Sequence, residues 1–146
     1  MYKRILVALE NSQTDQAILE HIRKLAKSCT ASLLFVHVAD GWVARNVKHL
    51  TLRESQEIQE DREYIERICA SFEDDGFEAD AVLAAGDPAT EIAALADGEG
   101  CDLIAMSTHG HRFFADVIYG SVASEVRHLT MVPVLLVRAP VKARVP

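Results

Sequence analysis

The sequence predicts a single α/β domain: a doubly wound parallel sheet of five strands with helices on both faces. Five short apolar runs recur along the 146 residues, and the segments between them change to the 3.6-residue period of helices. Most of these runs are almost continuously apolar, which is typical of strands covered on both faces. With 49% hydrophobic residues the chain can fill one core, so we expect one domain over residues 1–140 and a frayed tail over 141–146.

The five strands are expected at the apolar runs, each of which is bounded by polar or turn-forming residues. In the third run Ala79 and Ala81 alternate with the acidic Asp80, which suits a strand near an edge of the sheet. The runs are Ile5–Leu9, Ser32–Val38, Ala79–Ala85, Asp102–Met106 and Val132–Val137.

Start and stop signals place the first three helices between these strands. Ser12 or Thr14 is a candidate N-cap for the first helix, and Gly76 terminates the second. Asp87 followed by Pro88 is typical of an N-cap and a first helical position, so the third helix is expected to begin there. Strands therefore alternate with helices, which favours a parallel sheet.

The last helix is expected to begin near Ser121 and to end before Pro133. A helix N-terminus exposes unpaired backbone N–H groups and a partial positive charge, so Gly120, Ser121 and Val122 are predicted to form an anion cradle. Gly110 has no Cβ, which would let the preceding loop approach a ligand closely.

The position of a ligand depends on the strand order, which these patterns leave open. In open parallel sheets, ligands bind beyond the carboxyl ends of the strands where the order reverses. An order of 3-2-1-4-5 places this crevice between Leu9–Ser12 and Ser107–Gly110. An order of 2-1-3-4-5 would bring Ala85–Pro88 to the crevice instead.

The segment STHGHRFFADVIYGS, followed by VASEVRHLTMVPVLLVR, resembles the motif of ATP-binding members of the universal stress protein family. That motif has a glycine, two residues, a second glycine, nine residues, and then a glycine followed by Ser or Thr. The second glycine matches Gly110 and the final pair matches Gly120 and Ser121, whereas Ser107 stands in place of the first glycine. Further likenesses run from YKRILVALENS through LLFVHVAD and GDPATEI to VPVLLV.

The resemblance implies the order 3-2-1-4-5, a homodimer formed through the last strand, and ATP as ligand with Mg²⁺ on its phosphates. It also implies that Glu10, where the family usually has Asp, and Val38 lie beside the adenosine. Met106 and Ser107 would line the ribose and phosphates, and the hydroxyl of Ser107 is a candidate phosphate donor. The complete expected site is Ala8, Glu10, Val38, Met106, Ser107, His109, Gly110, Gly120, Ser121 and Val122.

Charge and hydropathy argue against several kinds of partner. The net charge is −7, and Thr51–Gly76 holds nine acidic residues against three basic ones, so this segment would repel a phosphate backbone. We therefore expect no nucleic-acid partner. The apolar runs are too short for a signal peptide or a membrane span, so we expect a cytoplasmic protein without a membrane partner.

Metal binding and disulfide formation are not expected. Cys29, Cys69 and Cys101 are odd in number and widely spaced, so they predict neither a disulfide framework nor a zinc site. His109 and His111 lack a third ligand at a recognisable spacing.

We expect a stress-response protein that binds ATP and acts as a regulatory dimer on an unknown client protein. The GxxxxGK, GxGxxG and GxSxG motifs are absent, so we expect no enzymatic activity beyond slow ATP hydrolysis. Two alternatives stay open. One is a dimer of the same family that binds no nucleotide, favoured by Ser107; the other is a receiver-like phosphoacceptor based on Asp87, although Arg138 stands where that chemistry needs lysine.

Overall fold

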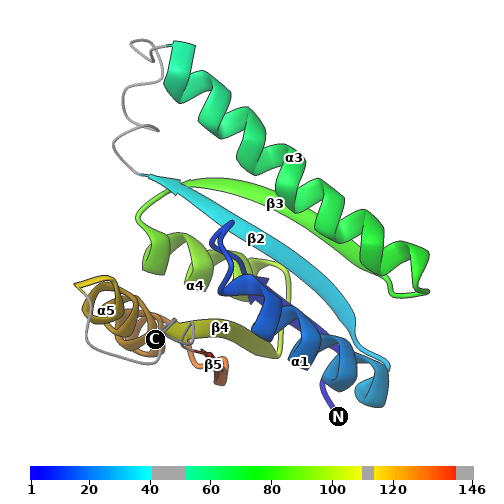
Figure 1. The fold of residues 1–146 in the computed structure, drawn as a ribbon. Coiled ribbons are helices and arrows are strands. Elements are labelled where there is room, and N and C mark those ends of the chain that lie inside the picture. The colour runs from blue at the N-terminus through cyan, green and yellow to red at the C-terminus, as the bar shows by residue number, and fades with distance from the viewer. Residues whose placement is uncertain (41–51, 110–113, 141–146) are drawn as a thin grey trace, which may run out of the picture.

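The computed structural model describes residues 1–40, 52–109 and 114–140 of the chain. Strands and helices alternate along it (Figure 1). The strands are β1 (Arg4–Ala8), β2 (Ser32–Asp40), β3 (Ala79–Gly86), β4 (Leu103–His109) and β5 (Val134–Ala139). The helices are α1 (Asp15–Cys29), α3 (Leu52–Asp74), α4 (Pro88–Gly98) and α5 (Phe114–Leu129). The predicted tail, 141–146, lies outside the described residues.

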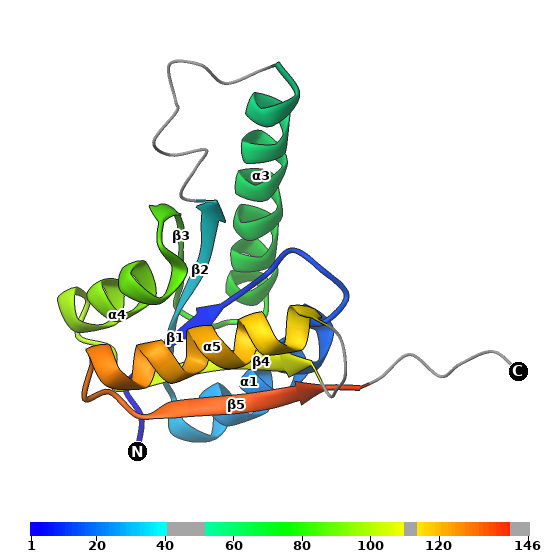
Figure 2. The same ribbon diagram turned by 90° about the vertical axis from the view of Figure 1, so that its left-hand side faces the viewer.

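The sheet has the order β3-β2-β1-β4-β5, and every neighbouring pair is parallel. The predicted fold class is therefore confirmed, and the open question of strand order is settled as 3-2-1-4-5. Strand β3 lies at an edge, as its alternating sequence predicted, and β5 lies at the other edge. Figure 2 shows α4 and α5 covering the face turned to the viewer, with α1 behind the sheet.

Two hydrophobic clusters, one on each face, explain why the strand sequences are continuously apolar. Ile5 and Val7 of β1 belong to the cluster that contains the buried residues of α1 and α3. Leu6, between them, belongs to the cluster with α4 and α5. Successive strand residues point to opposite faces, so a strand covered on both sides needs an apolar residue at each position. Each fully buried side chain of this size contributes about 1.5–3 kcal/mol of transfer free energy.

The ends of α3 and α4 follow the predicted signals. The carboxylate of Asp87 caps α4 by accepting hydrogen bonds from the backbone N–H of Thr90 at 3.0 Å and from its hydroxyl at 2.8 Å. Pro88 occupies the first helical position, as expected. After α3, Gly76 takes a φ of +93°, a conformation that favours glycine.

The start of α5 differs from the expectation. The helix begins at Phe114, so the backbone of Gly120 and Ser121 lies inside it and not at its N-terminus. A glycine inside a helix costs only about 1 kcal/mol relative to alanine, so the fold can accommodate Gly120 there. The prediction of a helix start near Ser121 was wrong, and Gly120, Ser121 and Val122 do not form the helix N-terminus on which the predicted anion cradle depended.

Within the described ranges, none of the helices combines the length and apolar character needed to cross a membrane. The three cysteines are not joined by disulfides: Cys69 and Cys101 are buried and Cys29 is half-buried.

Candidate nucleotide site at the reversal of strand order

A crevice is expected where β1 and β4 lie side by side, because the chain leaves these two strands toward opposite faces of the sheet. After β1 the chain enters α1, whose buried residues belong to one cluster. After β4 it leads to α5, whose buried residues belong to the other. We call Leu9–Ser12 the β1 end of the crevice and Ser107–His109 its β4 end.

Four of the predicted site residues share one apolar cluster on the α4 and α5 face of the sheet. Met106, near the end of β4, is buried in this cluster. Ala8 of β1, Val38 of β2 and Val122 of α5 pack against the same cluster and stay partly exposed. Three strands and one helix thus contribute to a single apolar cluster, and Ala8, Val38 and Met106 lie near the carboxyl ends of their strands. Such a surface suits a flat, largely apolar ring such as a nucleobase.

Glu10 lies directly beyond β1 and its carboxylate is held close to the first turn of α1. Its Oε2 accepts a hydrogen bond from the hydroxyl of Thr14 at 2.8 Å, and the hydroxyl of Ser12 lies 3.5 Å away. The side chain therefore has a local partner at the β1 end of the crevice and does not need a ligand to be ordered.

Asp15 organises the β1 end, although the sequence did not single it out. Its side chain is only 1% exposed. Its carboxylate accepts hydrogen bonds from the backbone N–H groups of Glu10 at 3.0 Å, Asn11 at 2.8 Å and Ser12 at 3.4 Å. Asn11 adopts a left-handed φ of +58°, which turns successive N–H groups toward the same point. Backbone arrangements of this kind bind anions, and here the protein's own carboxylate fills the position.

Helix α3 completes this arrangement through Tyr64. The tyrosine hydroxyl donates a hydrogen bond of 2.7 Å to Oδ2 of Asp15. Burial is the largest of the causes that raise the pKa of Tyr64 well above its usual range, and the hydrogen bond to Asp15 raises it further. The hydroxyl therefore keeps its proton. We refer to the Asp15 carboxylate, the three N–H groups and the Tyr64 hydroxyl as the Asp15 cluster.

A second contact from α3 reaches the same loop. Oδ1 of Asp61 accepts a hydrogen bond of 2.9 Å from the side-chain amide of Asn11. The other oxygen of Asp61 lies 3.3 Å from Nε2 of His37 on β2. Nδ1 of His37 in turn donates a 2.8 Å hydrogen bond to the carbonyl of Leu9. The β1 end is thus fixed to α3 at two positions and to β2 at one.

The β4 end contains a buried hydroxyl for which no partner is found among the described residues. Ser107 is 6% exposed, and within the described ranges its Oγ makes no hydrogen bond. Leu103 and Ala105, which precede it at intervals of two, belong to the α1 and α3 cluster. Because side chains alternate along a strand, Ser107 points to that face and away from the apolar surface of Met106.

The remaining predicted residues are only partly described. His109 ends β4, and Gly120 and Ser121 lie within α5, but their side chains fall outside the described part. Gly110 also lies outside it. Across the described ranges, no group of three or more His, Cys, Asp or Glu side chains could hold a metal ion.

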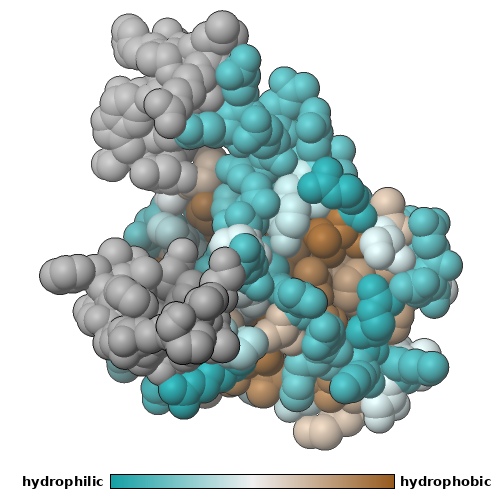
Figure 3. Space-filling view, viewed as in Figure 1, coloured by the Kyte–Doolittle hydropathy of each residue, from teal (hydrophilic) through white to brown (hydrophobic). Residues whose placement is uncertain are grey.

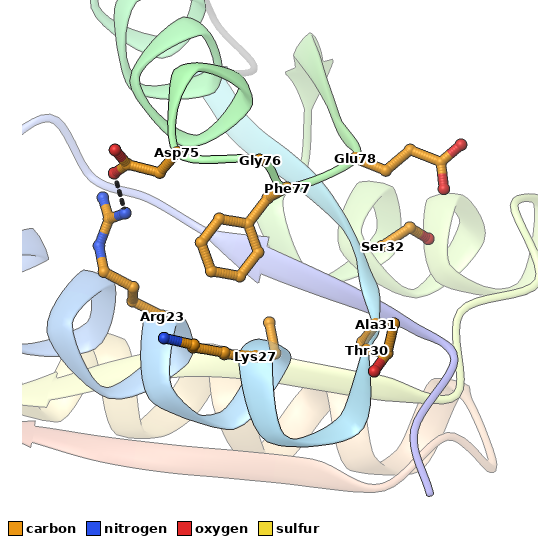
Figure 4. A pocket seen from close by; sticks show the side chains of 10 residues that line it. Arg23, Lys27, Thr30, Ala31, Ser32, Asp75, Gly76, Phe77 and Glu78 are labelled. Atoms are coloured by element: carbon orange, nitrogen blue, oxygen red, sulfur yellow. Dashed lines mark hydrogen bonds and ion pairs between the residues drawn. The ribbon is translucent and has the colours of Figure 1, made fainter.

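An open cavity of about 530 Å³ lies at the opposite end of the sheet, where β2 and β3 begin (Figure 4). None of the predicted site residues lines it. Arg23 spans its edge: the guanidinium pairs with Asp75 and lies 4.1 Å from the centre of the Phe72 ring. Figure 3 shows apolar surface between α1 and α3 on this side of the molecule. This cavity and the predicted crevice are therefore different places.

Comparison with known proteins identifies the family. The model of the universal stress protein family matches residues 1–138. A universal stress protein of Methanothermobacter thermautotrophicus is 31% identical, with 94% of this chain and 97% of the relative aligned. Universal stress protein MJ0577 of Methanocaldococcus jannaschii is 26% identical, covering 94% of this chain and 96% of the relative.

Solved structures agree with this assignment. The structure of protein MJ0577 superimposes with a TM-score of 0.79 at 28% identity, covering 97% of this chain and 99% of that one. A universal stress protein of Archaeoglobus fulgidus, solved in complex with dAMP, has the same fold at a TM-score of 0.68 and 20% identity, covering 93% and 98% of the two chains. With the strand order, the sequence motif and the family model in agreement, this chain belongs to the universal stress protein family.

Proposed function

We propose that this protein binds ATP in the crevice between β1 and β4 and acts as a nucleotide-dependent regulatory protein. The observation that carries the proposal is that Ala8, Val38, Met106 and Val122 belong to or pack against one apolar cluster, on the face of the sheet that α5 covers beside the reversal of strand order. Three of these side chains are partly exposed, so the surface can accept the adenine ring without unfolding of the core. A relative of the same fold was solved with dAMP, which supports a nucleotide as the ligand class.

The direction of the nucleotide follows from the Asp15 cluster. The N–H groups of Glu10, Asn11 and Ser12 already bind a carboxylate, so they are not free to bind a phosphate. The triphosphate should therefore extend from the β1 end toward the connection between β4 and α5, which carries Gly110 of the sequence motif. The β1 end would contact the nucleoside.

Magnesium would be held by the phosphates. The described residues offer no cluster of three metal-binding side chains, which fits an ion that arrives with the nucleotide and not one held by the protein alone. We propose no catalytic residue: ATP acts by favouring the conformation to which it binds better, and any hydrolysis is slow.

We also propose that two chains pair through β5. This strand is at an edge of the sheet, and its Leu136 is 46% exposed. An unpaired edge strand with an exposed apolar residue is a surface that proteins commonly cover. The bound nucleotide would then alter which client protein the dimer recognises.

Thermal unfolding with and without Mg-ATP tests the central proposal. At a ligand concentration one hundred times Kd, binding to the folded state adds about 2.7 kcal/mol and raises the Tm. Ala8→Leu places bulk on the proposed adenine surface and should abolish this rise. Ala85→Leu, at an exposed position of β3, is the matched control and should retain it. A wild-type Tm that stays constant up to millimolar Mg-ATP would contradict the proposal.

The alternative of a family member that binds no nucleotide rests on Ser107. This residue places a Cβ and a buried hydroxyl where the ATP-binding motif has its first glycine. The same experiment separates the two functions, since a non-binding dimer would show no shift in Tm. The receiver-like alternative is not supported, because the order 3-2-1-4-5 differs from the 2-1-3-4-5 order of receiver domains.

A further inference from the structure

We propose that Tyr64 and Asp61 of α3 are positioning residues for the nucleotide site, so that occupancy of the crevice and the placement of α3 are energetically coupled. The inference rests on the proposed nucleotide binding and adds a means by which the rest of the protein senses it. Neither side chain has to touch the nucleotide. Asp61 is hydrogen-bonded to Asn11 of the β1 end, and Tyr64 to Asp15, whose carboxylate binds the N–H groups of that end.

The first argument is that the β1 end is held by contacts from a distant part of the chain. Tyr64 donates to Asp15, 49 residues earlier, and Asp61 accepts from Asn11, 50 residues earlier. The two α3 residues are three positions apart, so they lie on the same side of the helix. The left-handed conformation of Asn11, which is uncommon for a residue other than glycine, is stabilised by hydrogen bonds to both its backbone and its side chain.

The second argument is where these contacts lie along α3. Toward the C-terminus the helix is anchored in the core by Ile65, Cys69 and Phe72, all buried. Toward the N-terminus, Gln56–Glu60 are exposed apart from a half-buried Ile58. Figures 1 and 2 show that this part of α3 extends beyond the ends of the strands. Asp61 and Tyr64 are therefore at the boundary between the packed and the projecting part of the helix.

The two arguments predict coupling in both directions. A nucleotide that contacts the β1 end selects the loop conformation in which the N–H groups of Glu10 and Asn11 face Asp15. That conformation presents the Asp15 carboxylate as acceptor for the Tyr64 hydroxyl and the Asn11 side-chain amide as donor to Asp61, so it also favours the observed position of α3. Such coupling is reciprocal: if bound nucleotide stabilises the α3 contacts by a given factor, then removing those contacts weakens nucleotide binding by the same factor.

The decisive variant is Tyr64→Phe, which removes one hydroxyl and keeps the ring. Tyr2→Phe is the matched control, since Tyr2 packs partly buried against the same cluster and no hydrogen bond of its hydroxyl is found in the described part of the chain. Asp61→Ala is a second variant, which removes the acceptor for the Asn11 side-chain amide and so tests the other contact to the same loop. ATP affinity is measured by calorimetry with Mg-ATP, at a temperature where every variant is fully folded.

We expect Tyr64→Phe and Asp61→Ala each to weaken ATP binding about fivefold to tenfold, and Tyr2→Phe to leave it unchanged. Hydrogen exchange of the peptide Leu52–Asp61 gives a second readout that a purely structural role would not change. In the wild type, Mg-ATP should slow exchange of these amides, and in Tyr64→Phe this effect should be lost. Together these results would support the coupling.

Two results would overturn the inference while leaving the proposed function intact. In one, the wild type binds ATP and Tyr64→Phe binds it with the same affinity. In the other, the wild type binds ATP without any change in the exchange of Leu52–Asp61. A wild type that binds no ATP would instead overturn the proposed function and, with it, the coupling.

Discussion

The β1 and β4 ends of the crevice are built in opposite ways. At the β1 end, the buried carboxylate of Asp15 accepts hydrogen bonds from three backbone N–H groups and one tyrosine hydroxyl. At the β4 end, the equally buried hydroxyl of Ser107 has no partner in the described part of the chain. One end is fixed by local hydrogen bonds and by one from the distant helix α3, whereas the other contains a buried hydroxyl for which the described residues provide no partner.

This difference separates two roles within one site. An end with a fully bonded carboxylate is largely preorganised, because its hydrogen bonds stabilise its conformation before a ligand binds. An unpaired buried hydroxyl destabilises the folded state by an amount that removing the hydroxyl would recover. We infer that the β1 end stabilises the fold and fixes the geometry of the crevice. At the β4 end, Ser107 is tolerated although it does not maximise stability.

Removing the Asp15 carboxylate is the strongest test of this comparison. Asp15→Ala leaves three backbone N–H groups and the Tyr64 hydroxyl without their acceptor, so we expect a loss of about 3 kcal/mol in the free energy of unfolding. For a domain of this size that corresponds to a Tm lower by about 10 °C. Urea and thermal unfolding followed by circular dichroism measure both quantities.

Formate provides a control that is specific to the N–H groups at the β1 end. A small carboxylate can occupy the space that Asp15→Ala opens, so high concentrations of sodium formate should raise the Tm of this variant more than that of the wild type. Sodium chloride at the same ionic strength should not distinguish the two. If Asp15→Ala were as stable as the wild type, the β1 end would not be fixed in the way that the contacts indicate.

Ser107→Ala tests the other end and has the opposite sign. Because the substitution removes a buried hydroxyl without a partner, we expect the free energy of unfolding to rise by about 1–2 kcal/mol. Ser107→Thr is a useful contrast, because it keeps the hydroxyl and adds a methyl group in a packed region, and should not be stabilising. A loss of stability in Ser107→Ala would show that the hydroxyl has a partner in solution.

Substitutions at Ser107 also test whether this residue affects nucleotide binding. The Ser107 side chain points to the α1 and α3 face, whereas Ala8, Val38 and Met106 face the other side. We therefore expect Ser107→Gly and Ser107→Ala to bind Mg-ATP with affinities equal within about twofold, which is less than 0.5 kcal/mol. A much tighter affinity in Ser107→Gly would instead mean that the Cβ obstructs the ligand, as the glycine of the family motif suggests.

The sequence predicted the fold better than it predicted the details of the site. The strands were identifiable because burial on both faces requires apolar residues such as Leu6 and Val7 at successive positions. The strand order could not be derived from local patterns, since it depends on which strands pair, and it was implied by the family resemblance. The apolar residues Ala8, Val38 and Met106 were named from the same resemblance, and the structure brings them together in one cluster.

Two features of the site were not predicted, for different physical reasons. An Asp at the start of a helix is common, and nothing local to Asp15 shows that Tyr64 will approach it from α3. The start of α5 at Phe114 was missed because Gly120 followed by Ser121 is a common helix start, whereas here both residues lie inside the helix.

The smallest expected effect is at Asp87. Like Asp15 it is an acidic residue at the start of a helix, but Asp87 is exposed whereas Asp15 is buried. Its hydrogen bonds from the hydroxyl and then the backbone N–H of Thr90 lower its pKa below the ordinary value of 3.8. A carboxyl whose pKa is lowered by folding stabilises the protein above the unfolded pKa, and this contribution is lost as the pH falls through the folded pKa. Asp87→Ala should therefore cost about 0.5–1 kcal/mol at pH 7, and the difference from wild type should shrink below about pH 4.

Asp87→Asn keeps an acceptor for the Thr90 N–H without titrating, so its stability relative to Asp87→Ala should be independent of pH in urea unfolding between pH 3 and 7. If the difference in the free energy of unfolding between wild type and Asp87→Ala stayed constant down to pH 3, the cap would not depend on the charge of Asp87. The predicted pH dependence would then be wrong.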